Sequence, residues 1–294
     1  MSSLKARYVD SPAAVKVLQW IGVVCLFTFL ATLIIALLQY LSGWNTSDIG
    51  NLKTIQAFQT LCVFLLPPLC VAYLWSEQPI RWLHLNRVVI PATIWLLVPL
   101  SMVIAAPGVN LLAHLNRQLD LPAFLQSVED IMKEMELRSE LLTEQFLQVS
   151  TFGALLINIL IMAFLPALGE ELTFRGLLLQ SLSARKHLAI WIVAIIFSAV
   201  HFQFYGFIPR MLFGAYFGYL LLWTDSLWIP VLAHFTNNAL AVIAAFIAYR
   251  YQLDTAVTDN LGTGDTLWLG ILSLCLTAAL IVCIYQLSAR QHQN

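Results

Sequence analysis

Residues 17–41 contain no charged side chain, and this is the feature of the sequence that most restricts the fold. A helix that crosses the hydrocarbon core of a bilayer needs about 20 mostly apolar residues, which this run supplies. Seven further apolar runs follow along the chain, at residues 55–75, 88–106, 151–182, 188–206, 209–223, 227–249 and 266–287. The sequence therefore predicts an all-α, polytopic membrane protein with a bundle of about eight transmembrane helices.

The composition supports a membrane protein and excludes other classes. Hydrophobic residues make up 60% of the chain and charged residues 11%, whereas soluble domains carry roughly 25% charged residues. A membrane barrel would alternate apolar and polar residues along strands of about ten residues, and the uninterrupted runs do not alternate. A formal net charge of -1 leaves no basic surface for nucleic acid. We therefore expect the lipid bilayer as the surroundings and no nucleic-acid partner.

Basic residues near the first run indicate its orientation. Lys5, Arg7 and Lys16 precede it, and an excess of Lys and Arg beside a membrane span marks the cytoplasmic side. With eight spans, both termini then face the cytoplasm. Six of the 15 basic residues fall on the other side: Lys53, Arg117, Lys133, Arg138, Arg210 and Arg250. We expect a multi-pass integral membrane protein with this topology, in a bacterial inner (plasma) membrane.

The chain shows no internal repeat and divides by hydropathy into three parts. Residues 1–149 hold the first three spans and a charged, amphipathic segment, residues 150–250 hold the polar motifs described next, and residues 251–294 hold a last span and a tail. In the amphipathic segment, residues 122–148, apolar side chains recur at helical spacing between acidic ones. This pattern is typical of a helix that lies in the membrane interface, either as a linker over the span ends or as a gate over a substrate entrance.

Ionisable side chains inside spans are costly and are functional candidates for that reason. The first group is Glu170, Glu171 and Arg175 in Pro-Ala-Leu-Gly-Glu-Glu-Leu-Thr-Phe-Arg-Gly. On a helix Glu171 and Arg175 are four residues apart and can form an ion pair. Glu170 points about 100° away from Glu171, so it keeps a different partner and is the carboxylate that we expect to react.

Two further polar groups lie in the following runs. His201 comes late in residues 188–206, and His234 shares a helix face with Asn238 early in residues 227–249. If residues 183–187 form the turn of a helical hairpin, Glu170 and His201 lie at one depth, roughly 24 Å from that turn. The same count places His234 shallower, so helix tilt or a projecting helix must bring it level.

These side chains suit hydrolysis of a peptide bond. A carboxylate held near a histidine and away from bulk water can remove a proton from a water molecule that attacks a carbonyl, which suits Glu170 with His201. The oxyanion that forms needs hydrogen-bond donors in a water-poor site, and His234 with Asn238 can supply them. Glu171 and Arg175 would hold the helix in place.

The order and spacing of these motifs resemble those of a known family. Glu-Glu-x-x-x-Arg at residues 170–175, Phe-x-x-x-His at residues 197–201 and His-x-x-x-Asn at residues 234–238 are similar to the motifs of the CPBP intramembrane proteases, which include the type II CAAX prenyl endopeptidases. The resemblance covers roughly residues 150–245. It implies an eight-helix bundle with a cavity open to the cytosol, a membrane-associated peptide or protein substrate, and catalysis by Glu170, His201, His234 and Asn238.

The resemblance leaves the cofactor and some of the chemistry open. Members of the family are described as zinc peptidases or as metal-free, glutamate-dependent peptidases. Zinc sites usually have three protein ligands and a water, which Glu170, His201 and His234 could supply, but no His-Glu-x-x-His motif is present and asparagine is an unusual zinc ligand. We favour the metal-free scheme. The alternatives to a protease are a non-catalytic peptide-binding or bacteriocin-immunity protein of the same fold and, less favoured because no inverted repeat is seen, a transporter.

Overall fold

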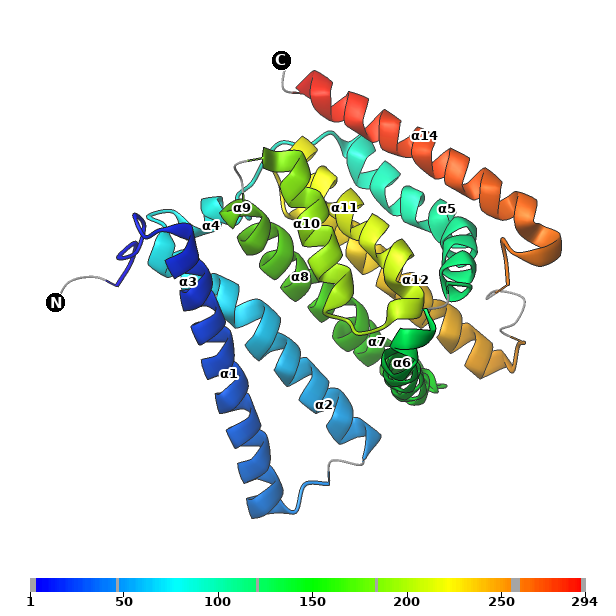
Figure 1. The fold of residues 1–294 in the computed structure, drawn as a ribbon, viewed down its shortest axis with the longest axis horizontal. Coiled ribbons are helices and arrows are strands. Elements are labelled where there is room, and N and C mark those ends of the chain that lie inside the picture. Colours follow the sequence, from blue (N-terminus) through cyan, green and yellow to red (C-terminus); the bar gives the residue numbers. More distant parts are fainter. Residues whose placement is uncertain (1–3, 46–47, 120–121, 183–184, 255–259, 292–294) are drawn as a thin grey trace.

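The computed structural model describes residues 4–45, 48–119, 122–182, 185–254 and 260–291. Within these residues the chain is helical and contains no strand, so the all-α prediction is confirmed. Figure 1 shows the helices packed side by side in a bundle, with α14 against α5 at one edge and the α1 and α2 hairpin at the opposite edge. Residues 183–184, part of the hairpin turn expected at 183–187, lie outside the described residues.

All eight predicted runs are helical. In the described part of the chain, six helical segments are long and apolar enough to cross a membrane. Four of them are single helices: α1 (Ala13–Ser42), α5 (Ala92–Arg117), α12 (Trp228–Tyr251) and α14 (Leu267–Gln291), the last with the turn η7 (Gly264–Thr266) before it. The fifth is continuous through α2 (Ile49–Thr60), η1 (Leu61–Leu65) and α3 (Leu66–Trp75). The sixth is continuous through α7 (Phe152–Asn158), η3 (Ile159–Phe164), α8 (Leu165–Glu171), η4 (Leu172–Leu178) and α9 (Leu179–Ser181). The two remaining runs form the shorter helices α10 (Lys186–Ala199) and α11 (Phe207–Thr224). The protein is a multi-pass integral membrane protein.

The amphipathic segment folds as predicted into a helix. A short turn, η2 (Ala123–Leu125), leads into α6 (Gln126–Leu147), which Figure 1 shows nearly end-on, across the direction of the spanning helices. Phe146 is buried against the bundle, and its carbonyl accepts a hydrogen bond from Asn158 Nδ2 at 2.8 Å. Apolar side chains of α6 such as Ile131 and Leu137 remain exposed. They suit contact with lipid, and the position of α6 in the membrane interface remains a prediction.

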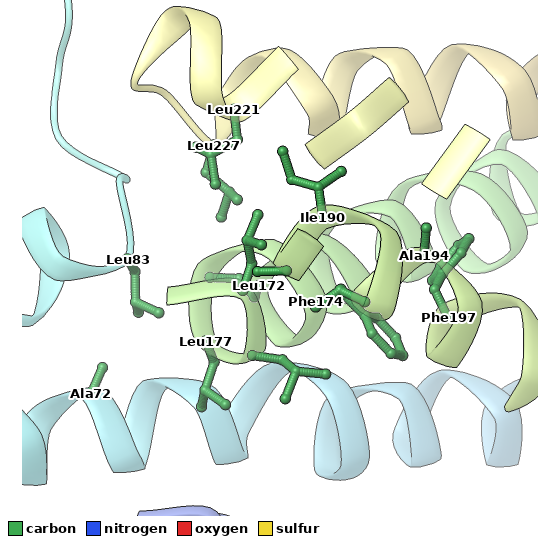
Figure 2. Close-up of a cluster of buried hydrophobic side chains, with 14 of the residues drawn as sticks. Ala72, Leu83, Leu172, Phe174, Leu177, Ile190, Ala194, Phe197, Leu221 and Leu227 are labelled. Carbon is green, nitrogen blue, oxygen red and sulfur yellow. The ribbon is translucent and has the colours of Figure 1, made fainter. Parts of the chain in front are cut away.

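The buried core joins the first helices to the motif-bearing ones. Figure 2 shows Leu172, Phe174 and Leu177 of η4 pointing toward Ala72, Leu83, Ile190, Ala194, Phe197, Leu221 and Leu227 from the surrounding elements. All of these side chains are buried. Dispersion contacts in such a core are individually weak and collectively large, so the helix that carries Glu170 and Glu171 is fixed from several sides.

Two stretches of π-helix flank α8 within one span. η3 ends at Phe164 and η4 begins at Leu172, so α8 carries both glutamates on a single short α-helical stretch between them. Such i to i+5 stretches are rare and are frequently found at functional sites.

Candidate active site

Glu171 and Arg175 form a fully buried ion pair, as the spacing predicted. Arg175 Nη1 donates to Glu171 Oε1 at 2.8 Å, and both side chains are 0% exposed. Arg175 Nη2 also donates to the carbonyl oxygen of Gly214 at 2.9 Å. The guanidinium carbon lies 4.5 Å from the ring centre of Phe197 and 5.4 Å from that of Phe217. Hydrogen bonds and ring faces thus compensate part of the cost of burying this charge, while Arg175 Nε and Glu171 Oε2 are buried without a hydrogen-bond partner among the described residues.

Glu171 also holds a histidine. His234, on α12, lies with its Nδ1 2.8 Å from Glu171 Oε1, and its ring stacks on Phe217 with ring centres 5.3 Å apart. A carboxylate accepts hydrogen bonds, so Nδ1 carries the proton and donates it. The ring is therefore oriented with Nε2 on its far side, 3.8 Å from Glu170 Oε2. Glu171 was expected to pair with Arg175, and the structure adds the contact with His234.

His201 lies in the turn that follows α10 and presents the same ring atom. Its Nδ1 lies 2.7 Å from the carbonyl oxygen of Phe197. A carbonyl can only accept, so Nδ1 is the protonated nitrogen and, in the neutral ring, Nε2 carries the lone pair. His201 Nε2 lies 3.8 Å from Glu170 Oε2. The imidazole is partly open, with 27% of its side chain exposed.

Glu170 is the meeting point of the two histidines. Its side chain is 15% exposed. Its atom Oε2 is buried and has no hydrogen-bond partner among the described residues, while both histidine Nε2 atoms lie 3.8 Å away. A buried carboxylate oxygen without a partner is unusual in a folded protein, since leaving it unpaired costs free energy. The structure thus brings Glu170, His201 and His234 together, and their roles in catalysis remain predictions.

Asn238 follows His234 by one turn of α12. Its Oδ1 accepts a hydrogen bond from Asn237 Nδ2 at 3.2 Å, which leaves its own amide hydrogens available as donors. Within the described part of the chain no hydrogen bond joins Asn238 to Glu170, His201 or His234. Asn238 is therefore linked to these three residues only through its position on α12, one turn after His234, and not through a hydrogen bond.

Two contributors to the site were not predicted. Phe217 stacks on His234 and also lies beside Arg175, and the carbonyl of Gly214 accepts from Arg175. A Cβ atom at position 214 would lie 3.1 Å from Ala194 Cα and 3.2 Å from Phe197 Cδ1. Glycine therefore permits the close approach of α11 to α10 that brings both groups to the site. In the sequence, only the three-residue spacing of Gly214 and Phe217 hints that they share a helix face.

The three candidate zinc ligands do not form a metal site as they are placed. Protein ligands bind zinc at about 2.0–2.2 Å through nitrogen or oxygen. Across the described residues, no group of three or more His, Cys, Asp and Glu side chains is arranged to hold a metal ion. Glu170, His201 and His234 are the candidates that approach this arrangement most closely, through the two 3.8 Å separations.

In a comparison with known proteins, the segment that contains these residues matches a family model. Residues 152–240 match the family model described as type II CAAX prenyl endopeptidase Rce1-like. The chain is 31% identical over 98 residues to the uncharacterized protein YpbD of Bacillus subtilis (strain 168), an alignment that covers 32% of this chain and 48% of that protein. This chain thus spans about half the length of that relative. No solved structure matches. The resemblance inferred from the motifs is confirmed.

Proposed function

We propose that this chain, in which residues 152–240 form a segment of the type II CAAX prenyl endopeptidase Rce1-like family, is an intramembrane endopeptidase. It hydrolyses a peptide bond of a membrane-associated protein or peptide with a water molecule activated by Glu170. The observation that supports this most directly is the buried Glu170 Oε2, which lacks a hydrogen-bond partner among the described residues and lies 3.8 Å from Nε2 of both His201 and His234.

The proposed reaction begins at Glu170. The two 3.8 Å separations exceed hydrogen-bond length, so in this scheme a water molecule enters the site and bridges the carboxylate and the His201 ring. Glu170 removes a proton from this water while the oxygen attacks the carbonyl carbon of the substrate. The tetrahedral intermediate then collapses, the C–N bond breaks, and Glu170 returns the proton to the leaving amine. Each proton and each electron pair is accounted for without a covalent enzyme intermediate.

His234 and Asn238 stabilise the oxyanion in this scheme. The bond from Nδ1 to Glu171 fixes the His234 ring, and in the doubly protonated ring Nε2 becomes a donor. Asn238 offers its amide hydrogens one turn away. Donors that are fixed before the reaction cost no reorganisation as the charge develops.

Mass spectrometry of protein termini tests the proposal. Membranes from cells that express the wild type are compared with membranes containing Glu170→Gln at matched abundance, and Glu77→Gln serves as a matched control because Glu77 is an exposed carboxylate away from the site. New termini present with the wild type and Glu77→Gln, and absent with Glu170→Gln, are expected. They would also show whether the substrate is a prenylated protein C-terminus or a peptide precursor. Equal termini in all three would refute the peptidase, and a wild-type phenotype retained by Glu170→Gln would favour a non-catalytic peptide-binding or immunity protein.

A further inference from the structure

The N-terminal segment around Ala6 and the last turns of α14 lie at the same end of the bundle. The N-terminal segment is attached to the end of α3, where Ala6 N donates to Tyr73 O at 3.0 Å and Tyr8 N donates to Leu74 O at 3.0 Å. The last turns of α14 pack on the start of α5, since Ile284 shares a buried cluster with Ile94. We call this the terminal end. The opposite end, where α5 and α12 finish and α6 lies, is the α6 end.

The short helices α10 and α11 leave space at the α6 end. α10 has 14 residues and α12 has 24, so at 1.5 Å per residue they are about 21 Å and about 36 Å long. The turn between α10 and α11 carries His201 and therefore lies short of the point where α12 finishes. Side chains of α6 reach into the region between this turn and the end of α12.

A large cavity with a mixed polar and apolar lining occupies that region, and we call it the α6 chamber. Its volume is about 880 Å³. Four carboxylates, two guanidinium groups and several amides are among its lining groups, contributed by Arg117, Glu136, Glu140, Glu144, Gln148, Gln203, Arg210, Gln252 and Asp254. Ligand pockets of 300–1,000 Å³ are typical, and apolar side chains such as Leu147 and Ala248 complete the lining. The charged and amide groups can form hydrogen bonds to the backbone of an extended peptide, and the apolar groups can contact its side chains.

The inner wall of the chamber adjoins the active site. Gln203 follows His201 by two residues, and Arg210 donates to Gln203 O at 3.0 Å and to Gln203 Oε1 at 2.9 Å. Arg210 also lies within electrostatic range of Glu170 and His201. Gln203 and Arg210 therefore belong to the chamber wall and also adjoin the segment that carries His201.

Polar contacts hold α6 over this wall. Gln203 Nε2 donates to Ser139 Oγ at 2.6 Å, and Tyr205 N donates to Glu136 Oε2 at 3.4 Å. Hydrogen bonds of this kind can exchange for bonds to water at little net cost. They position α6 without sealing it to the bundle as an apolar interface would.

We propose that the peptide substrate reaches Glu170 through the α6 chamber, from the aqueous phase opposite the one that holds both termini. This inference rests on the proposed function and adds the route and the kind of substrate segment: an extended, hydrated stretch of peptide beside the scissile bond. Cytoplasmic termini and a site open to the cytosol, which were both expected from the sequence, are then incompatible, because the chamber and the termini occupy opposite ends of the bundle.

Cysteine labelling tests the route without depending on catalysis. Ala248→Cys and Thr143→Cys place thiols in the chamber wall, and Asp10→Cys places one in the exposed N-terminal segment. The full-length variants are exposed in intact cells, and in membrane vesicles of the opposite orientation, to a membrane-impermeant maleimide. Wild type measures the background from the five native cysteines. We expect both chamber thiols to react from one side and Asp10→Cys from the other.

Other labelling patterns would overturn the proposal. If the chamber thiols and the Asp10→Cys thiol react from the same side of the membrane, the chamber and the N-terminal segment do not lie at opposite ends of the bundle. Chamber thiols that react only after denaturation show that water does not fill the cavity. The functional arm is cleavage by labelled Ala248→Cys, which we expect to fall at least tenfold relative to the unlabelled variant while labelled Asp10→Cys is unchanged. Full cleavage after complete labelling would exclude the chamber as the route. If the protein is not a peptidase, the wild type and Glu170→Gln give the same protein termini, and the labelling pattern still reports the side on which the chamber opens.

Discussion

Glu171 Oε1 accepts a hydrogen bond from His234 Nδ1 at 2.8 Å, although 63 residues separate the two in sequence. The same oxygen accepts from Arg175 at 2.8 Å. Glu171 therefore takes part in two interactions. Its ion pair with Arg175 fixes α8 to η4, and its hydrogen bond with His234 orients the ring that faces Glu170. The supporting pair and the proposed catalytic groups form one connected network, in which Glu171 is a positioning residue.

The first prediction separates these two tasks of Glu171. Glu171→Leu leaves Arg175 buried without its carboxylate, and breaking a buried pair in this way costs about 3–5 kcal/mol. The double variant Glu171→Leu/Arg175→Met should recover much of the thermal stability, since apolar replacement of a whole buried pair is often neutral or stabilising. Cleavage should remain lost in both, because His234 Nδ1 has no acceptor. Thermal unfolding in detergent and cleavage rates are the two measurements.

The control for this prediction is the exposed pair of Glu134 and Arg138 on α6, which is also four residues apart, with Nη2 and Oε1 separated by 2.6 Å. Glu134→Leu should change the unfolding free energy by only about 0.3–0.5 kcal/mol. If the double variant regained full cleavage, Glu171 would be a structural partner of Arg175 alone and its contact with His234 would have no role in the reaction.

The second prediction concerns the oxyanion donors. Asn238→Ala should lower kcat by about 10²–10³-fold with little change in KM, as expected when one fixed oxyanion donor is removed. Asn237→Ala should have a smaller effect in the same direction, because Asn237 Nδ2 holds Asn238 Oδ1 at 3.2 Å and so orients the amide. Wild-type kcat in Asn238→Ala would remove this residue from the mechanism.

The third prediction tests the metal-free scheme. Purified protein treated with a strong chelator should keep its cleavage rate, and its zinc content should be far below one ion per chain, because Glu170 acts as the base for a water that is not bound to metal. Loss of activity on chelation with recovery on adding Zn²⁺ would contradict this. Glu170, His201 and His234 would then act as ligands, which would require them to close around the ion from their present positions.

The sequence was sufficient to predict the fold class and the local part of the site. Long uncharged runs such as residues 17–41 have few alternatives to a membrane helix, and all eight runs are helical. The pairing of Glu171 with Arg175 depends only on helical spacing, which holds in the structure. Features set by neighbours along one helix were therefore predictable.

Features that depend on several helices were not predictable from spacing. Counting residues from the nearest turn put His234 shallower than Glu170, yet its Nε2 lies 3.8 Å from Glu170 Oε2. A residue count measures depth along one helix from its own turn and carries no information on where that turn lies in the bundle. For the same reason the contact of His234 with Glu171 and the α6 chamber were missed. The segment that forms α6 was predicted as an interfacial helix, and its sequence pattern does not show which groups it would meet on the bundle.

The fourth prediction uses Glu136, which lies on α6, outside the spanning helices. Burial raises the pKa of its carboxyl above the ordinary value of 4.5, and this effect exceeds the opposing hydrogen bond from Tyr205 and the attraction of Arg210. The folded state therefore holds the proton more tightly than the unfolded state, and stability falls as the pH rises from the ordinary glutamate pKa through the raised one. Glu136→Gln removes this loss.

The variant should accordingly be slightly more stable than the wild type at neutral pH, and the two should converge at acidic pH, below the ordinary pKa. Thermal unfolding across pH 4 to 8 measures this, and Glu134→Gln is the control because Glu134 is exposed on the same helix. A Glu136→Gln protein that is less stable than the wild type at neutral pH would show the opposite balance. The bond to Tyr205 and the attraction of Arg210 would then outweigh burial, and the charged form of Glu136 would hold α6 against the turn that carries His201.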